Sequence, residues 1–172
     1  MKKGFTLIEL LIVIAILAIL ATAVVLVLNP AQILAQARDS QRISDLGSVK
    51  SAIALYLATT TSTPAMTLTV GCTNAAPTPY GAGACARTST AIDGTGWVGV
   101  DLRQTSGGSS LGALPIDPLN NSTTSQYSYK ADTALTFKLT GSLESTKYAP
   151  MMGTDGGSWA GTYEVGTNLS IN

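Results

Sequence analysis

The chain has 172 residues, of which 12% are charged, and its 10 basic and 10 acidic side chains give a formal net charge of zero. It contains no histidine, which excludes the Ser-His and Cys-His pairs of nucleophilic catalysis. Beyond Arg38 and Arg42 no basic patch is evident, and no aromatic stacking platform accompanies that pair. We therefore expect neither an enzyme nor a nucleic-acid-binding protein.

The first 28 residues place two lysines ahead of a long apolar segment. From Leu10 to Leu28 the only non-apolar side chain is Thr22. An apolar run of this length predicts a membrane-spanning helix rather than a core helix. Lys2 and Lys3 precede it, and no basic residue follows before Arg38. This asymmetry predicts a cytoplasmic N-terminus and an exported C-terminal bulk.

An acidic side chain, Glu9, lies at the start of this apolar segment. On insertion scales an ionisable group there costs about 2.5–3.5 kcal/mol, so we expect a specific partner for Glu9. The surrounding residues, Gly4-Phe5-Thr6-Leu7-Ile8-Glu9, resemble the processing site of type IV prepilins and type II secretion pseudopilins. The resemblance implies that prepilin peptidase cleaves after Gly4 and that Phe5 becomes the N-methylated amino terminus. It also implies that Glu9 meets the Phe5 amino group of a neighbouring subunit in a filament.

This pairing of Glu9 with an amino terminus is physically reasonable. A helix N-terminus carries a positive partial charge, an α-amine adds a full one, and a carboxylate neutralises both away from water. Because Phe5 and Glu9 are four residues apart on one helical face, they can also pair within a single chain. The sequence leaves both arrangements open.

Two simpler interpretations of the N-terminus compete with the prepilin signal. An ordinary secretory signal would use Ala21-Thr22-Ala23 as its cleavage site. Glu9 would then interrupt its apolar region without purpose, and the apolar run continues past that site to Leu28. A plain single-span anchor explains the length of the run but not the combination of Gly4, Phe5 and Glu9.

After the span, Asn29-Pro30 predicts a kink or a short unwound stretch, because proline lacks an amide hydrogen and restricts the residue before it. The helix is then expected to resume from 31 to about 58. Asp39, Arg42 and Asp45 are spaced three apart and are expected to pair on a solvated helix surface. An apolar stripe at helical spacing is expected to pack against a globular domain; it comprises Ile43, Leu46, Val49, Ile53 and Leu57.

Thr59 to Pro64 marks the end of this helix and the start of a loop-rich region with short strands, such as 66–70 and 97–102. Cys72 and Cys85 enclose 12 residues rich in proline and glycine, and in an oxidising compartment a disulfide is the economical interpretation. Zinc is the alternative, but two thiols without histidine make a poor site. The G-x-G-x-x-G pattern at 94–99 lacks the strand and helix of a dinucleotide site and is interpreted as a glycine-rich turn.

The segment 114–120 contains Asp117 flanked by prolines and resembles the region before the sheet in pseudopilins and related pilins. A β meander is predicted to follow it, with strands at 127–130 and 135–140, shorter pieces near Tyr148 and at 163–165, and a turn at 131–133. Packed on the helix stripe, these strands predict an α+β pilin fold, in which a long N-terminal helix packs against a small antiparallel sheet.

The loop 152–157 is glycine-rich and acidic, and a similar region of major pseudopilins binds calcium. By this resemblance Asp155 and Asp117 are calcium candidates, provided that the fold brings them together. The alternative is a tight turn in which Asp155 caps the backbone and Gly156 has a positive φ. No other cofactor is expected.

Taken together, these features predict a structural subunit of a type IV pilus-like filament. Its precursor is expected in the inner membrane and its assembled form on the cell surface. Its expected partners are prepilin peptidase, identical subunits and an inner-membrane assembly platform. The alternatives are a type II secretion pseudopilin and a membrane-anchored or secreted binding domain. The expected parts are a leader (1–4), a transmembrane helix (5–28), a helix half packed on the head (29–58), a loop-rich region (59–125) and a sheet with a C-terminal tail (126–172).

Overall fold

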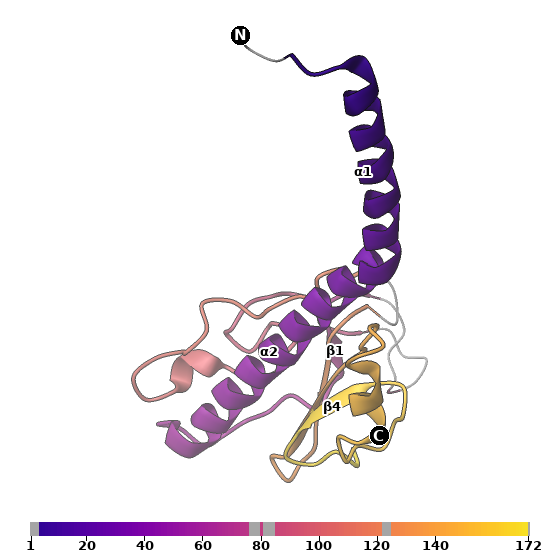
Figure 1. Ribbon diagram of the computed structural model, residues 1–172. Coiled ribbons are helices and arrows are strands. Elements are labelled where there is room, and N and C mark those ends of the chain that lie inside the picture. Colours follow the sequence, from indigo (N-terminus) through magenta and orange to yellow (C-terminus); the bar gives the residue numbers. More distant parts are fainter. Residues whose placement is uncertain (1–3, 76–79, 81–84, 122–124, 172) are drawn as a thin grey trace. The chain divides into compact units, whose positions relative to one another are not determined.

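The computed structural model describes residues 4–75, 80, 85–121 and 125–171. The chain divides into two compact units, residues 1–35 and 36–172, and we describe each by itself (Figure 1). The described elements are α1 (Leu7–Leu28), α2 (Pro30–Thr59), β1 (Gly71–Cys72), the 3-10 helix η1 (Leu102–Gln104), β2 (Ser128–Ala131), β3 (Phe137–Gly141), the 3-10 helix η2 (Ala149–Gly153) and β4 (Tyr163–Gly166).

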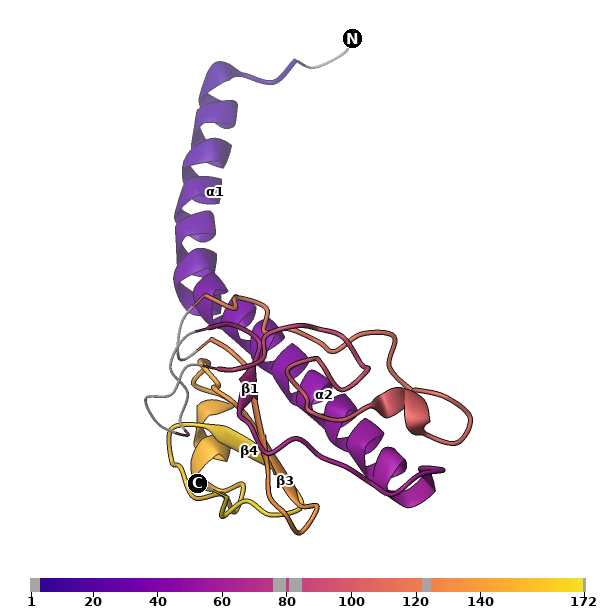
Figure 2. The same cartoon turned by 180° about the vertical axis from the view of Figure 1, so that it is seen from behind.

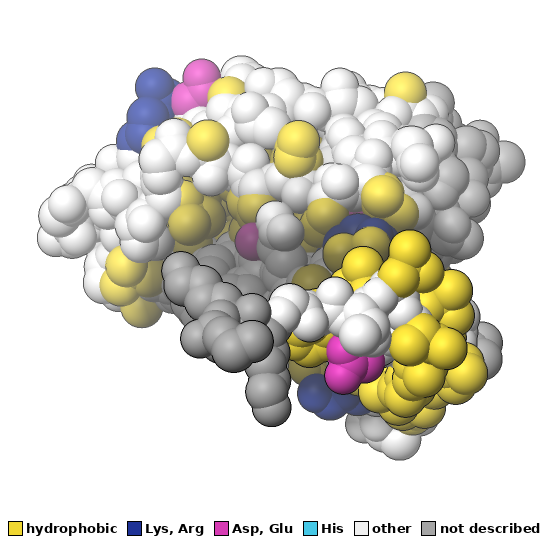
Figure 3. Space-filling model, turned by 45° about the horizontal axis from the view of Figure 1, so that its top comes forward, with side chains coloured by type: hydrophobic (Ala, Val, Ile, Leu, Met, Phe, Trp, Pro, Cys, Tyr) yellow, Lys and Arg dark blue, Asp and Glu magenta, His cyan; other side chains and the backbone are white. Residues whose placement is uncertain are grey.

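The first unit consists of α1 and the beginning of α2. Residues Leu7–Val25 have a mean hydropathy of 3.0, none of them is buried, and they are long and apolar enough to cross a membrane. In Figure 3 the densest group of hydrophobic side chains is the one on α1. A helix that served as the core of a soluble domain would be covered, so the exposure of α1 agrees with the predicted membrane anchor.

The break between the two helices falls where Asn29-Pro30 predicted it. Asn29 has the left-handed conformation, with φ 40° and ψ 75°, and ends α1. Its carbonyl oxygen accepts the N–H groups of Gln32 (2.9 Å) and Ile33 (3.3 Å), so the same residue also starts α2. Pro30 occupies the first position of α2, where its missing N–H costs nothing.

In the second unit, which we call the head, α2 packs against an antiparallel sheet of four strands in the order β1-β2-β3-β4. Both views show α2 lying beside the strands (Figures 1 and 2). The predicted α+β arrangement is therefore confirmed. The main contributors to the shared core are Leu46, Val49, Ile53 and Tyr56 of α2, Trp97 and Val98 of the loop region, and Tyr127, Tyr129, Phe137 and Leu139 of the sheet region.

The predicted strands near residues 130, 138 and 164 are present, but three others are absent from the described residues. Residues 66–70 and 97–102 form no ladder, and Tyr148 precedes η2 instead of lying in a strand. Residues 97–100 and Leu102 are all buried, so the alternation of residue types does not mark one face of a strand, and the backbone groups bond to the 89–92 segment and to Thr67. The Trp97 N–H donates to the Ser89 carbonyl oxygen, and the Leu102 N–H donates to that of Ile92. The Gly99 carbonyl oxygen accepts the N–H of Thr67.

The hairpin between β2 and β3 turns at Asp132–Thr136, slightly later than predicted. Asp132 accepts the backbone N–H groups of Ala134 and Thr136, both at 3.0 Å. Leu135 has a positive φ of 59°, which a side chain other than glycine tolerates only when its surroundings impose it. The Asp132 carboxylate supplies that constraint.

Cys72 in β1 and Cys85 are joined by a disulfide across a sequence separation of 13, and both side chains are buried. The bridge ties the edge strand β1 to the loop-rich region, where few regular hydrogen bonds hold the chain. A loop of this length is expected to gain about 3 kcal/mol from the cross-link.

We predict that replacing both cysteines by serine lowers the free energy of unfolding by about 3 kcal/mol, because the unfolded chain regains the freedom that the closed loop removes. Thermal unfolding of the detergent-solubilised chain measures this difference. A reducing agent should produce a similar loss in the wild-type chain and no loss in the variant. Equal stability of the two oxidised chains would contradict the prediction.

Candidate functional site: the N-terminal segment and the ion network of the head

The predicted processing junction lies in an exposed, non-helical stretch before α1. A Cβ atom added to Gly4 would meet no atom within 4 Å, and Gly4 has no positive φ that would require glycine. The folded chain itself therefore does not demand a glycine here. Phe5, the next residue, is 82% exposed, so both sides of the Gly4-Phe5 peptide bond are accessible.

Glu9 forms a capping box with Thr6 at the start of α1. Its Oε2 atom accepts the backbone N–H of Thr6 at 2.9 Å and the Thr6 hydroxyl at 2.8 Å, and the Glu9 N–H donates back to Thr6 Oγ1 at 3.3 Å. Two donors of the helix terminus are thereby satisfied. The T-x-x-E spacing of Thr6 and Glu9 is a known capping signal, which the sequence analysis did not use.

The capping box occupies only one of the two Glu9 oxygens. Within the described part of the chain, Oε1 accepts no hydrogen bond, and Glu9 bonds to Thr6 and not to Phe5. A carboxylate at this position is also favoured by the positive end of the helix dipole. Glu9 can therefore hold the helix start and still present one oxygen to an external cationic donor.

The head contains a buried ion network that contradicts the expected solvated surface of α2. Asp39 and Arg42 are 0% and 1% exposed. The reason is their position on the helix, since they continue the buried face of α2 towards its N-terminus at spacings of three and four. That face comprises Ala35, Asp39, Arg42, Leu46, Val49, Ile53 and Tyr56. The sequence analysis considered only the apolar members of this stripe and so missed the two charged ones.

Arg42 binds three carboxylates from separate segments. Its Nε and Nη2 atoms donate to both oxygens of Asp117, at 2.7 and 3.1 Å. Its Nη1 atom donates to Asp39 at 2.9 Å and to Glu144 at 2.8 Å. Arg38 adds a two-pronged contact to Glu144, at 2.6 and 2.8 Å. The network fastens the 115–120 loop and the 142–145 segment to α2.

Backbone donors complete the network. Asp39 accepts the N–H groups of Glu144 and Ser145, and Asp117 accepts those of Leu119 and Asn120. Buried charges are tolerated when they are paired and hydrogen-bonded, and both carboxylate oxygens of each aspartate accept at least one hydrogen bond here. The proline-flanked Asp117 is thus the residue through which its loop docks on α2.

A second buried ion pair, Lys138–Glu164, lies on the face of the sheet opposite to the one that packs against α2. Lys138 Nζ donates to Glu164 at 3.0 Å, and both side chains are at most 1% exposed. The Lys138 ammonium also lies 3.5 Å from the centre of the Trp159 ring, a cation–π contact. Burial lowers the pKa of Lys138, an effect that Glu164 opposes. The sequence analysis missed this pair, whose signal is a lysine alternating with Phe137 and Leu139 in a central strand.

The contacts of the two calcium candidates do not fit a calcium site. Asp117 holds Arg42, and Asp155 accepts the N–H groups of Gly157 (2.8 Å) and Glu164 (2.7 Å). Calcium needs several free oxygen ligands, whereas these oxygens face N–H donors. No group of three or more His, Cys, Asp or Glu side chains among the described residues is arranged to hold a metal. Asp155 and Gly156, with φ 83°, instead form the tight turn that was the alternative.

We predict that Arg42→Met lowers the free energy of unfolding by about 3–5 kcal/mol, because it leaves the buried carboxylates of Asp39 and Asp117 without a cation. Arg103→Met is the matched control, since the Arg103–Asp101 pair is exposed and should cost at most about 1 kcal/mol. Chemical denaturation of both variants measures the difference. Similar costs for the two substitutions would show that burial does not strengthen the Arg42 contacts.

The network also predicts acid sensitivity. Hydrogen bonds from Arg38, joined by Arg42, lower the pKa of Glu144 from its ordinary value of 4.5 to about 2. Because the folded state holds the ionised form, this contribution to stability is complete above pH 4.5 and is lost as the pH falls towards 2. The stability difference between the wild type and Glu144→Gln should be constant above pH 5 and shrink below pH 4.5. A difference independent of pH down to pH 2 would contradict this.

Comparison with known proteins gives a match for the N-terminal segment alone. Residues 1–25 match the family model described as the prokaryotic N-terminal methylation motif. No curated protein matches the chain, and no solved structure matches it. The motif covers Gly4, Phe5, Glu9 and nearly all of α1. The chain therefore carries the N-terminal methylation signal of type IV pilins and pseudopilins, joined to an apolar helix and an α+β head.

Proposed function

We propose that this protein is a structural subunit of a type IV pilus-like filament. The observation that carries the proposal is the methylation motif at residues 1–25, which coincides with a fully exposed apolar helix that begins at a capped carboxylate. The precursor is stored in the membrane through α1 and is cleaved after Gly4 by prepilin peptidase. An assembly platform in the inner membrane then adds it to identical subunits, and the assembled filament extends from the cell surface.

The exposed junction supports cleavage. Gly4 has room for a side chain and is not required by the fold, so a requirement for glycine would come from the enzyme that recognises it. Cleavage after Gly4 converts the Phe5 amide nitrogen into an amine, which places a positive charge one residue before the N-cap Thr6. The new charge adds to the positive end of the helix dipole.

The exposure of α1 supports assembly. An apolar surface of this size is stable only in lipid or against another apolar surface, because its hydration is unfavourable. A subunit that leaves the membrane must therefore cover α1 with the same helix of other copies. In that setting the free Oε1 of Glu9 lies in an environment of low polarity, where an α-amine of a neighbouring copy is a favourable partner.

Pseudopilins of type II secretion systems share this signal and are the second candidate. The two functions differ in where the mature chain accumulates. The test is to shear the surface of the native cells, collect the filament fraction and determine the N-terminus of this chain by mass spectrometry. Abundant chain that begins at methylated Phe5 supports the pilin. The same terminus found only in membranes supports the pseudopilin, and a start near Val24 overturns both.

We predict that Glu9→Ala permits cleavage after Gly4 but blocks filament assembly, because the junction is intact while the charge partner of the neighbouring amine is lost. Two variants separate this role from helix capping. Glu9→Gln keeps an acceptor for the Thr6 N–H but removes the charge, and Thr6→Ala removes the capping hydroxyl but keeps the charge.

Filament yield and the mature N-terminus are measured for the three variants. We expect assembly to fail in both Glu9 variants and to persist in Thr6→Ala. If Thr6→Ala and Glu9→Ala fail alike while Glu9→Gln assembles, Glu9 acts as a helix cap and not as a charge partner. Normal filaments from Glu9→Ala would exclude both roles.

A further inference from the structure

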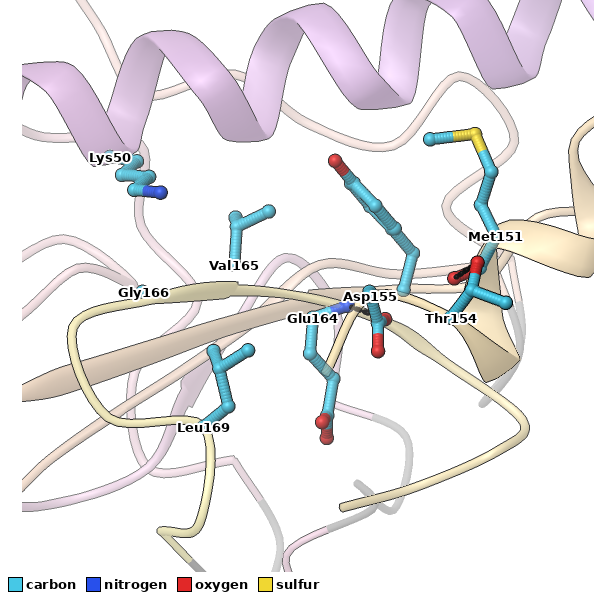
Figure 4. Close-up of a pocket in the computed structure, with 9 residues that line it drawn as sticks. Lys50, Met151, Thr154, Asp155, Glu164, Val165, Gly166 and Leu169 are labelled. Atoms are coloured by element: carbon cyan, nitrogen blue, oxygen red, sulfur yellow. Dashed lines mark hydrogen bonds between the residues drawn. The ribbon is translucent and has the colours of Figure 1, made fainter. Parts of the chain in front are cut away.

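A groove of about 260 Å³ lies in the head between α2 and the edge strand β4 (Figure 4). Lys50 extends from α2 on one side of it, Val165 points towards α2 from β4, and Met151 and Thr154 lie at the far end. Pockets for drug-sized ligands span about 300–1,000 Å³ and enclose most of the ligand. This smaller, open groove fits one or two side chains of a protein partner better.

The groove presents an unpaired positive charge beside a lining that mixes polar and apolar groups. Lys50 is exposed and, among the described residues, has neither an ion pair nor a hydrogen bond. Two acidic residues also line the groove: Asp155 has both carboxylate oxygens committed to backbone N–H groups, and Glu164 is paired with Lys138. The complementary partner is therefore a carboxylate carried on a small surface turn.

The chain contains one such carboxylate, at Asp93. All ten acidic residues lie in the described part of the chain. Glu9 belongs to the anchor and Asp155 lines the groove. Five others are ion-paired, namely Asp39, Asp101, Asp117, Glu144 and Glu164, and two are held by polar neighbours across the fold, namely Asp45 by Tyr127 and Asp132 by Asn168.

Asp93 is half-buried and held in a fixed orientation; among the described residues it forms no ion pair, and the positive charge of Arg103, which is paired with Asp101, also acts on it. Its Oδ1 atom accepts the backbone N–H of Thr95 at 2.9 Å and also the Thr95 hydroxyl, while Gly94, with φ 85°, completes a tight turn. These hydrogen bonds lower the pKa of Asp93, so its carboxylate remains charged. The turn is pre-organised, which reduces the entropy lost on binding.

The groove and the Asp93 turn lie on opposite sides of the head. The backbone of Asp93 forms an isolated antiparallel β-bridge with the backbone of Asp101, the N-cap residue of η1. Figures 1 and 2 both show η1 and β4 on opposite sides of α2. Two complementary patches on opposite sides of one molecule cannot bind each other, but the patch of one copy can bind the other patch of the next copy, head to tail. When the copies are related by a helical rotation, this contact repeats along the array without closing into a ring.

We propose that the Lys50 groove of one subunit receives the Asp93 turn of the next subunit, so that the heads as well as the helices make directional contacts. This inference rests on the proposed filament function. The ion pair sets the order of the heads, and the apolar side chains of Met151 and Val165 exclude water around it. A charge pair shielded in this way contributes more than one on an open surface.

The test is a charge swap in the full-length chain, expressed in cells that lack the native copy. Lys50→Glu and Asp93→Lys should each reduce the mass of sheared filaments about tenfold, because each places like charges together at every contact. The double variant restores opposite charges and should recover most of the yield. Lys147→Glu is the matched control, since it reverses another exposed lysine outside the groove and should leave the yield unchanged.

Thermal unfolding and the mature N-terminus are measured for each variant, so that misfolding and failed processing are detected separately. Filaments at wild-type yield from either single variant would overturn the inference but leave the proposed function intact. A double variant no better than the worse single variant would also overturn it. A defect in Lys50→Glu alone would assign the groove to an acidic partner other than a second copy. Absence of wild-type filaments despite mature chain would instead refute the proposed function.

Discussion

The head depends on one guanidinium group. Arg42 joins α2 to the 115–120 loop through Asp117 and to the 142–145 segment through Glu144, and these two segments flank the hairpin of β2 and β3. A buried ion network of this kind adds little net stability over an apolar core of the same volume. Breaking it is costly, because displacing either segment from Arg42 would leave a buried carboxylate without its cation. The apolar contacts of α2 set how much the head gains by folding, and Arg42 selects which loops lie where.

The two carboxylates that matter most in this chain are held in opposite ways. Asp117 is saturated by Arg42 and two backbone N–H groups inside the head. Glu9, on the exposed helix, is saturated on one oxygen only. A saturated buried group fixes a structure, whereas a half-satisfied group in an apolar setting gains free energy from a further partner. This difference separates the head, whose buried charges are paired within it, from the helix that we propose is completed by assembly.

Local signals in the sequence were reliable where the structure is local. Asn29 and Pro30 predicted the helix break, the apolar spacing predicted α2, and the alternation around Phe137 predicted a central strand. The errors share one cause. Residues 97–102 alternate in residue type, yet nearly all of them are buried and no strand pairs with them. Asp39 and Arg42 look like a solvated pair unless the positions of their distant partners are known. In each case the deciding contact lies far away in the sequence.

The sequence by itself determined the membrane-anchoring helix, its methylation signal and the α+β class, because apolar length, a short motif and residue periodicity are properties of neighbouring residues. Only the tertiary structure decided which charges are buried, which carboxylates are already occupied and which remain available. Those outcomes depend on residues some 75–106 positions apart, as in the pairs of Arg42 with Asp117 and Arg38 with Glu144. No periodicity encodes such distances, so the role of Arg42 emerges only from the folded chain.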